Sequence, residues 1–144
     1  MDNCTGLLYT VDDCRLIEFG KHHRPNGNLT VVQGNRDVPF DIRRTYYIYD
    51  VPGGEDRGGH AHKELSQLIV AVSGAFDVVI DDGSSRKIFT LNRPYQGLLL
   101  QPGIWRELNN FSSGAVTLVL ASDLFSEEDY IRRYGDFLVF RGRG

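Results

Sequence analysis

Short runs of Val, Ile, Tyr and Phe, separated by turn residues, make up most of the chain from Leu29 to Ser122. Runs of this kind between Gly, Pro, Asp and Asn are typical of β-strands. Many short strands without a long helix favour a closed barrel or a sandwich, so the sequence predicts an all-β fold. The expected strands are Leu29–Val32, Phe40–Tyr49, Gly59–Ala61, Glu64–Ser73, Ala75–Asp81, Arg86–Leu91, Gln96–Leu100, Ile104–Asn109 and Ala115–Ala121.

Alternation within these runs predicts which strand faces are buried. Phe76, Val78 and Ile80 share one face of their strand, because side chains two positions apart point the same way. Leu68–Val72 is apolar throughout and is expected to be buried on both faces. The following Asp81-Asp82-Gly83 predicts a hairpin turn, since glycine accepts the positive φ of a tight turn.

One helix is expected, near the C-terminus. Ser126 has the character of an N-cap, and three acidic residues follow it in what would be the first turn. Acidic groups there suit the positive end of the helix dipole. The sequence therefore predicts a helix from Ser126 to about Tyr134.

Composition limits which kinds of molecule the protein is expected to bind and in which cellular compartment it is expected. The chain has 144 residues and no internal linker, which predicts one domain over residues 1–144. A formal net charge of −3 gives no basic footprint for nucleic acid. The apolar runs are far too short to cross a membrane, and acidic residues in the first twenty positions argue against a signal peptide. Cys4 and Cys14 form no CxxC pair, which fits free thiols in a cytoplasmic protein.

The four histidines fall into two pairs. His22 and His23 lie in a polar stretch and are expected in a solvated loop. His60 and His62 differ, because on a strand their i, i+2 spacing places both side chains on one face. Arg57 and two glycines stand just before them.

A metal site, an acid–base site and a structural role compete as explanations of His60 and His62. A metal would need further ligands, and Glu64 or the weaker Gln67 are the nearest candidates. No histidine follows His62, so the ligand set is incomplete and no metal is predicted. A buried, hydrogen-bonded core pair is the plainest alternative.

Acid–base chemistry is favoured by the polar residues expected on neighbouring strands. Histidine exchanges protons near neutral pH, and Tyr46 on an earlier strand offers a partner. Arginine is the preferred residue for phosphate, and Arg44, Arg57 and Arg106 are available to hold a diphosphate. Trp105 offers a flat surface on which a base or sugar could stack, and the alternative role for its ring is to plug the barrel.

Ordered motifs from Gly27 to Phe137 resemble one enzyme family, the nucleotide-linked sugar 3,4-ketoisomerases. These are the WxcM-like members of the cupin superfamily. The 3,5-epimerases of the deoxyrhamnose pathway are similar in the Arg-Gly-x-His segment and share the fold. The motifs are Arg44-Thr45-Tyr46-Tyr47-Ile48-Tyr49-Asp50, Arg57-Gly58-Gly59-His60-Ala61-His62-Lys63, Pro102-Gly103-Ile104-Trp105-Arg106-Glu107, Leu120-Ala121-Ser122-Asp123 and Asp129-Tyr130-Ile131-Arg132.

The resemblance implies a fold, a substrate and a reaction. The fold would be a cupin jelly-roll β-barrel, of the type seen in those epimerases (RmlC-like), with a short C-terminal helix. The substrate would be dTDP-4-keto-6-deoxy-D-glucose, and moving its carbonyl from C4 to C3 would give a product for later transamination. The protein would be a homodimer with exchanged N-terminal strands, and it would need no metal or organic cofactor.

The resemblance also implies roles for individual residues. His60 would take the C3 proton, Tyr46 would carry a proton to or from the substrate, and His62 would act as a second acid/base or orienting group. Residues expected to contact the substrate are Arg44, Arg57, Lys63, Gln67, Trp105, Arg106 and Asn26.

Three positions depart from relatives. Arg106 stands where some members have a histidine, and because arginine is no acid near pH 7 this favours the gluco over the galacto product. The segment Arg24-Pro25-Asn26-Gly27 differs at Asn26, since relatives often have an acidic residue and Arg-Gly in this segment. Gly59 replaces a bulkier residue beside His60. Two alternatives stay open: a dTDP-sugar 3,5-epimerase, and a non-catalytic cupin that binds sugar nucleotides.

Overall fold

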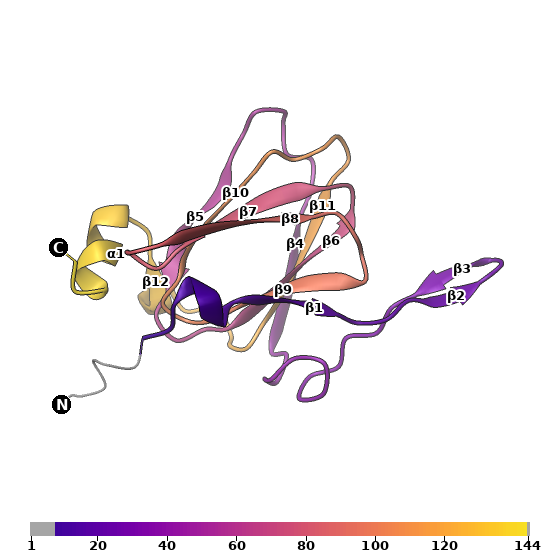
Figure 1. Ribbon diagram of the computed structural model, residues 1–144, viewed down its shortest axis with the longest axis horizontal. Helices are drawn as coiled ribbons and strands as arrows, with labels where there is room; N and C mark the ends of the chain where they lie inside the picture. Colours follow the sequence, from indigo (N-terminus) through magenta and orange to yellow (C-terminus); the bar gives the residue numbers. More distant parts are fainter. Residues whose placement is uncertain (1–7, 144) are drawn as a thin grey trace.

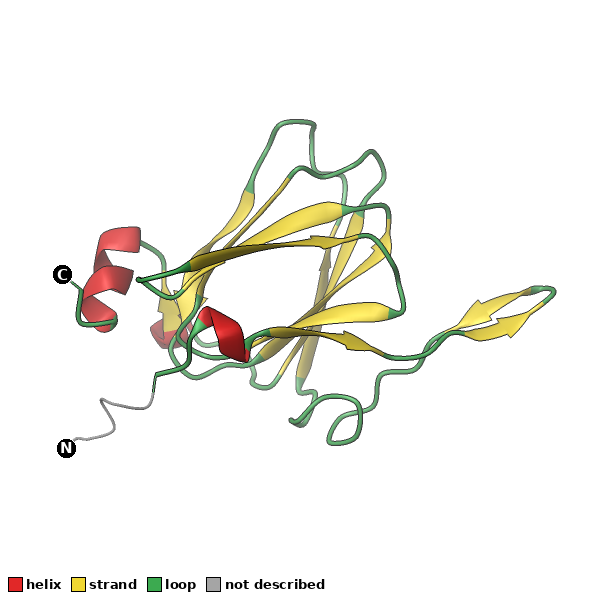
Figure 2. Cartoon of the chain, in the orientation of Figure 1, coloured by secondary structure: helices red, strands yellow, loops and turns green. Residues whose placement is uncertain are grey.

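The computed structural model describes residues 8–143, which form two facing antiparallel sheets with one short helix at the side (Figures 1 and 2). The strands are β1 (Arg15–Glu18), β2 (His22–Arg24), β3 (Gly27–Leu29), β4 (Arg44–Ile48), β5 (Arg57–His62), β6 (Gln67–Ser73), β7 (Phe76–Asp81), β8 (Arg86–Leu91), β9 (Gln96–Leu100), β10 (Trp105–Asn109), β11 (Val116–Ala121) and β12 (Tyr130–Ile131). The helix is α1 (Tyr134–Phe140).

Each sheet mixes strands from distant parts of the chain. The hydrogen-bonded order is β1-β9-β6-β11-β4 in the first sheet and β12-β5-β10-β7-β8 in the second. Every pairing between these strands is antiparallel. This arrangement confirms the prediction of an all-β, jelly-roll barrel with a short C-terminal helix.

Most expected strands are present with changed bounds. The predicted turn at Asp81-Asp82-Gly83 joins β7 to β8, with Gly83 at φ +92°. One oxygen of Asp82 accepts the backbone N–H groups of Ser84 and Ser85, which fixes the turn. The strand expected at Leu29–Val32 is wrong beyond its first residue, because β3 ends at Leu29. Strands β1 and β2 were not expected.

The predicted helix at Ser126 to Tyr134 is wrong. Only Glu127–Asp129 forms a 3-10 turn, and the Ser126 side chain makes no capping hydrogen bond. The next two residues, β12, instead extend and pair with β5. The acidic pattern that suggested a helix start serves other contacts, since Glu127 pairs with Arg132 and Asp129 binds His62.

Apolar side chains fill three layers. The largest cluster lies between the sheets and includes Phe76, Val78 and Ile80, which confirms their shared buried face. A second cluster, around Leu68 and Val70, covers the outer face of the first sheet. The third cluster, the helix cluster, packs Ala61, Trp105, Ile131 and Phe137 together on the outside of β5 and β10.

A hairpin arm of β2 and β3 extends away from the barrel (Figure 1). His22 and His23 are exposed on it, in a strand rather than the expected loop. Cys14 is a buried free thiol, whereas Cys4 lies outside the described residues. Among residues 8–143, no helix is long and apolar enough to cross a membrane.

Candidate active site

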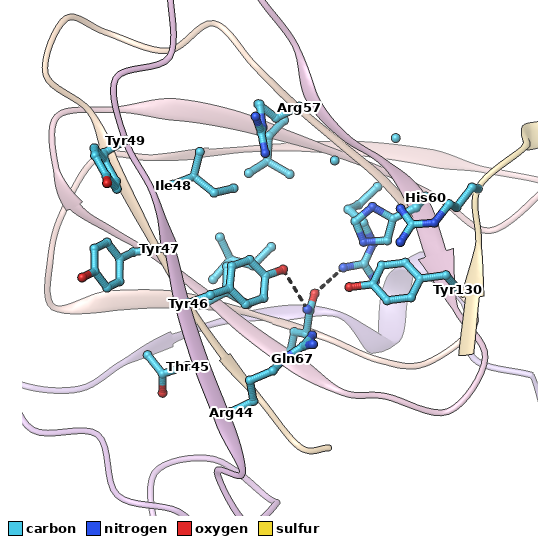
Figure 3. A pocket seen from close by; sticks show the side chains of 17 residues that line it. Arg44, Thr45, Tyr46, Tyr47, Ile48, Tyr49, Arg57, His60, Gln67 and Tyr130 are labelled. Atoms are coloured by element: carbon cyan, nitrogen blue, oxygen red, sulfur yellow. Dashed lines mark hydrogen bonds between the residues drawn. The ribbon is translucent and has the colours of Figure 1, made fainter. Parts of the chain in front are cut away.

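A cavity of about 640 Å³ opens between the two sheets (Figure 3). The first sheet contributes side chains from β4, β6 and β11, and the second contributes them from β5, β10 and β12. Strand alternation explains this collection, because inward positions of several strands meet in one space. The polar side chains that line it include Arg44, Tyr46, Arg57, His60, Gln67, Arg106, Tyr130 and Arg132.

A bulge in β5 places Arg57 and His60 on the same cavity. His60 pairs with Arg106 of β10, but Arg57 pairs with Leu108, so β5 carries one extra residue between them. Gly58 adopts φ +84° within this bulge. A Cβ there would also approach Leu108 Cδ1 to 3.0 Å. Only glycine suits this position without strain.

His60, His62 and Asp129 form a hydrogen-bonded chain. The Nε2 atoms of the two histidines are 3.1 Å apart, and His62 Nδ1 lies 3.0 Å from Asp129 Oδ2. The carboxylate only accepts, so His62 donates from Nδ1 and its Nε2 accepts from His60. The second Asp129 oxygen accepts the backbone N–H of Glu64, which holds the carboxylate in place. His62 is therefore an orienting group behind His60.

Burial keeps both imidazoles neutral. Desolvation, and then the positive charge of Arg106, lower the pKa of His60 from 6.5 to about 2. The same two causes lower the pKa of His62 to about 2. Charge on either ring would be costly in this partly dry, cationic site. His60 thus faces the cavity as an unprotonated base at neutral pH.

A second chain joins Tyr46 to Gln67 and Arg106. Gln67 Nε2 lies 3.2 Å from Tyr46 Oη, and Arg106 Nη1 donates to Gln67 Oε1. The remaining Arg106 donors reach the carbonyl of Ile104. Arg106 is almost fully buried, and that burial lowers its pKa to about 10, which still leaves it charged at neutral pH.

Arg44 lines the cavity and carries two buried donors that are unused. Its Nε and Nη2 are buried and have no hydrogen-bond partner among the described residues. The guanidinium lies between aromatic rings, 5.3 Å from the centre of Tyr46 and 5.5 Å from that of Phe125. Buried donors without partners cost free energy, so this group is suited to an anionic oxygen of a ligand.

Three residues expected to touch substrate lie elsewhere in this chain. Trp105 faces the opposite side of β10, where its ring packs 5.7 Å from Phe137 and its Nε1 donates to Glu107. Lys63 is exposed beyond the end of β5. Asn26 sits in the turn of the hairpin arm, away from the cavity (Figure 1).

The sequence reasoning missed three residues of the site. Asp129 orients His62, the Tyr130 ring lies 5.1 Å from that of His60, and Arg132 stacks on Tyr130 at 4.0 Å. All three lie in or beside β12. Their motif was visible, but the acidic residues before it suggested a helix, so no site role was assigned to them.

The arrangement is suited to moving protons. Among residues 8–143, no group of three or more His, Cys, Asp or Glu side chains converges as a metal site requires. The cavity instead combines a neutral imidazole, a phenol and several guanidinium groups. A base and an acid on separate walls, in a cationic setting, can isomerise a carbonyl compound through an enediolate.

A family model described as FdtA, WxcM-like, C-terminal matches residues 12–142 of the 144. The chain belongs to the FdtA family. A relative in Aneurinibacillus thermoaerophilus, a TDP-4-oxo-6-deoxy-α-D-glucose-3,4-oxoisomerase, is 44% identical over 123 residues, covering 85% of this chain and 88% of the relative.

Solved structures of similar proteins share the FdtA-family fold. A 3,4-ketoisomerase from Helicobacter canadensis has a TM-score of 0.88 at 42% identity, covering 90% of this chain and 98% of its own. A histidine-to-asparagine variant of the 3,4-ketoisomerase QdtA from Thermoanaerobacterium thermosaccharolyticum was solved with TDP-4-keto-6-deoxyglucose. It has a TM-score of 0.89 at 37% identity, covering 95% of this chain and 97% of its own. These likenesses confirm the cupin-type barrel.

Proposed function

We propose that this protein is a TDP-4-keto-6-deoxy-D-glucose 3,4-ketoisomerase. The observation that carries the proposal is a neutral, half-buried His60 across the cavity from Tyr46 (Figure 3). The relative named as a TDP-4-oxo-6-deoxy-α-D-glucose-3,4-oxoisomerase and the QdtA variant solved with TDP-4-keto-6-deoxyglucose support the same substrate class. Isomerisation needs no other chemistry than two proton transfers at carbon and two at oxygen.

In the first half of the reaction, His60 removes the proton from C3. The C3–H electron pair forms the C3–C4 double bond, and the carbonyl electrons move to the C4 oxygen. Tyr46 protonates that oxygen, which gives an enediol. Arg44, with its two unpartnered buried donors, stabilises the negative charge as it develops.

In the second half, the Tyr46 phenolate takes the proton of the C3 hydroxyl, and C3 becomes the carbonyl carbon. The double-bond electrons take a proton from solvent water at C4, and His60 releases the C3 proton to solvent, so both residues are restored and the atoms balance. Because the Arg106 guanidinium stays charged, with a pKa of about 10, it supplies no proton at neutral pH. We therefore propose the gluco configuration at C4 and a 3-keto product ready for transamination.

The diphosphate is assigned to the mouth of the cavity. Arg57 and Arg132 both line the cavity and are exposed. Planar guanidinium groups bind two phosphate oxygens at once, and here they keep some contact with solvent. Arg44 lies deeper, which leaves it for the sugar oxygens.

Proton NMR of dTDP-4-keto-6-deoxyglucose incubated with the protein in deuterium oxide tests the reaction. We expect a 3-keto product with deuterium at C4 and a large coupling between H4 and H5 in water, as the gluco configuration gives. Deuterium at C5 would instead indicate the 3,5-epimerase alternative. Tight TDP binding with no turnover would indicate the non-catalytic alternative.

We also propose a homodimer in which N-terminal strands are exchanged. The hairpin arm supports this proposal, because within the described residues 8–143 β2 and β3 pair only with each other, and Leu29 on the arm is 58% exposed. An exchanged arm would give Asn26 a partner surface that it lacks within one chain. Light scattering on the whole chain should give twice the monomer mass, and a monomer at micromolar concentration would contradict the dimer.

A further inference from the structure

The Gln67 side chain has only one orientation that satisfies its neighbours. Arginine carries donors and no acceptor, so the atom of Gln67 that meets Arg106 Nη1 is the carbonyl oxygen. The amide nitrogen therefore faces Tyr46 Oη, 3.2 Å away. Arg106 itself is fixed by its other donors, which bind the Ile104 carbonyl. Both hydrogen bonds thus donate in the same direction, from Arg106 to Gln67 and from Gln67 to Tyr46 (Figure 3).

This polarity decides where the hydroxyl proton of Tyr46 points. Because Gln67 donates to the phenol oxygen, Tyr46 cannot use its own proton toward Gln67. That proton is left to point into the cavity. We propose that Gln67 and Arg106 are positioning residues that hold Tyr46 as a hydrogen-bond donor toward the substrate oxygen. The inference rests on the proposed function, because it gives Tyr46 the part of the acid.

The two chains of the site then have opposite polarity. Asp129 accepts from His62, which accepts from His60, so the chain on the β5 side leaves the other ring nitrogen of His60 as the atom that can accept a proton. The chain on the β6 side ends in a cation and favours a proton leaving Tyr46. No acidic side chain of residues 8–143 forms an ion pair with Arg106. Its charge therefore stays available to stabilise negative charge forming on or near Tyr46.

The competing explanation is that Gln67 is itself a substrate ligand. Both Gln67 and Arg106 line the cavity, so position alone does not separate the roles. The Gln67→Glu variant separates them, because it keeps the size of the side chain and reverses its polarity. A carboxylate accepts from Arg106 and also from Tyr46, which turns the phenol proton away from the substrate. It also gives the buried Arg106 a counterion, so the fold is expected to persist.

Steady-state kinetics on Gln67→Glu, Tyr46→Phe and the double variant test the inference. We expect Gln67→Glu to lower kcat about 100-fold, as loss of a general acid does, with KM and TDP affinity within about twofold. We expect the double variant to be no slower than Tyr46→Phe, because both changes remove one function. Gln67→Met, which removes the donor without reversing it, should cost less than Gln67→Glu.

Three results would overturn the inference. One is full turnover by Gln67→Glu, and another is a double variant whose loss is the product of the two single losses. The third is a KM that rises while kcat is kept, which would make Gln67 a substrate ligand. A failure of the proposed function looks different, because the wild type itself would then form no 3-keto product or would place deuterium at C5.

A readout without turnover completes the test. Tyrosinate absorbance, measured against pH in the wild type minus Tyr46→Phe, isolates Tyr46 from the other six of the seven tyrosines. The Gln67→Glu change should move this titration to higher pH, because a carboxylate disfavours a neighbouring phenolate. An unmoved titration would show that Gln67 does not act on Tyr46.

Discussion

The two faces of the β5–β10 pair share one backbone but carry different side chains, polar on the face toward the cavity and apolar on the face toward α1. The inner face carries His60 and Arg106, opposite each other in register, and lines the cavity. The outer face carries Ala61 and Trp105, which pack under α1 against Phe137. Successive residues on each strand therefore serve opposite purposes, because side chains alternate across a sheet.

This difference indicates how the fold stays stable although its active site contains desolvated ionisable groups. Desolvation of the His60 and His62 imidazoles and of the Arg106 guanidinium costs free energy, as their lowered pKa values indicate. The helix cluster on the outer face buries apolar surface and offsets part of that cost. Changes on the inner face should therefore reduce activity, and changes on the outer face should reduce stability.

The largest expected effect is on the inner face, in His60→Asn. We expect kcat to fall about 1,000-fold, because the C3 proton loses its base. The free energy of unfolding should change by less than about 1 kcal/mol, since an amide still fills the site and avoids a desolvated ring. Turnover by NMR and chemical unfolding measure the two quantities. Unchanged turnover would remove His60 from the role of base.

The next effect is on the outer face, in Phe137→Ala. Phe137 belongs to α1 and is fully buried against Trp105, so its removal should cost about 3–5 kcal/mol of stability. We expect kcat at low temperature to stay within about twofold, because no cavity-lining group moves. Val139→Ala is the matched control on the same helix, since Val139 is 66% exposed. A kcat that falls with stability in Phe137→Ala would show that the two faces are coupled.

The sequence predicts the barrel well because its signals are local. Alternation at Phe76, Val78 and Ile80, and the turn at Asp81-Asp82-Gly83, follow from neighbouring residues alone. The paired His60 and His62 were equally readable, since their spacing predicts one strand face. Tyr46 and Arg44 follow the same rule on β4, and the cavity includes both.

What the sequence could not predict depends on distant pairing. Residues Tyr130–Ile131 become a strand only because β5 offers them a free edge, against the local helix signal. Asp129 is therefore recognisable as the partner of His62 only in three dimensions, because the two residues are 67 positions apart in the sequence. Trp105 was expected at the substrate because its flat ring suits stacking, but it adjoins the cavity-lining Arg106 on one strand, and adjacent residues of a strand face opposite ways.

A smaller effect is expected from pH, again on the inner face. Since His60 is held neutral, with a pKa of about 2, kcat/KM should stay level from about pH 8 to pH 5 instead of falling near 6.5. Stability should behave differently. The folded pKa values of His60 and His62 lie below the unfolded value of 6.5, so the unfolded chain binds more protons in acid. Stability is therefore complete above pH 6.5 and decreases as the pH falls.

Thermal unfolding of His62→Gln against pH checks this stability effect. The variant should lose less stability than the wild type between pH 6.5 and about 4.5. The wild type loses stability there because His62 takes up a proton only in the unfolded chain, and glutamine takes up none. His22→Gln is the control, since His22 is exposed on the hairpin arm and should leave the curve unchanged. A fall in kcat/KM centred near pH 6.5 would contradict the neutral, buried state of His60.

The smallest effect is expected on the outer face, in Trp105→Phe. The change keeps an aromatic ring against Phe137 and removes the Nε1 hydrogen bond to Glu107, so stability should fall by about 1 kcal/mol. Calorimetric titration with TDP should give an affinity within about twofold of the wild type, because Trp105 faces away from the cavity. The expected role of Trp105 in stacking on the substrate requires instead a marked loss of affinity. A tenfold weaker TDP affinity with unchanged stability would mean that the two faces of β10 are not separate in the working enzyme.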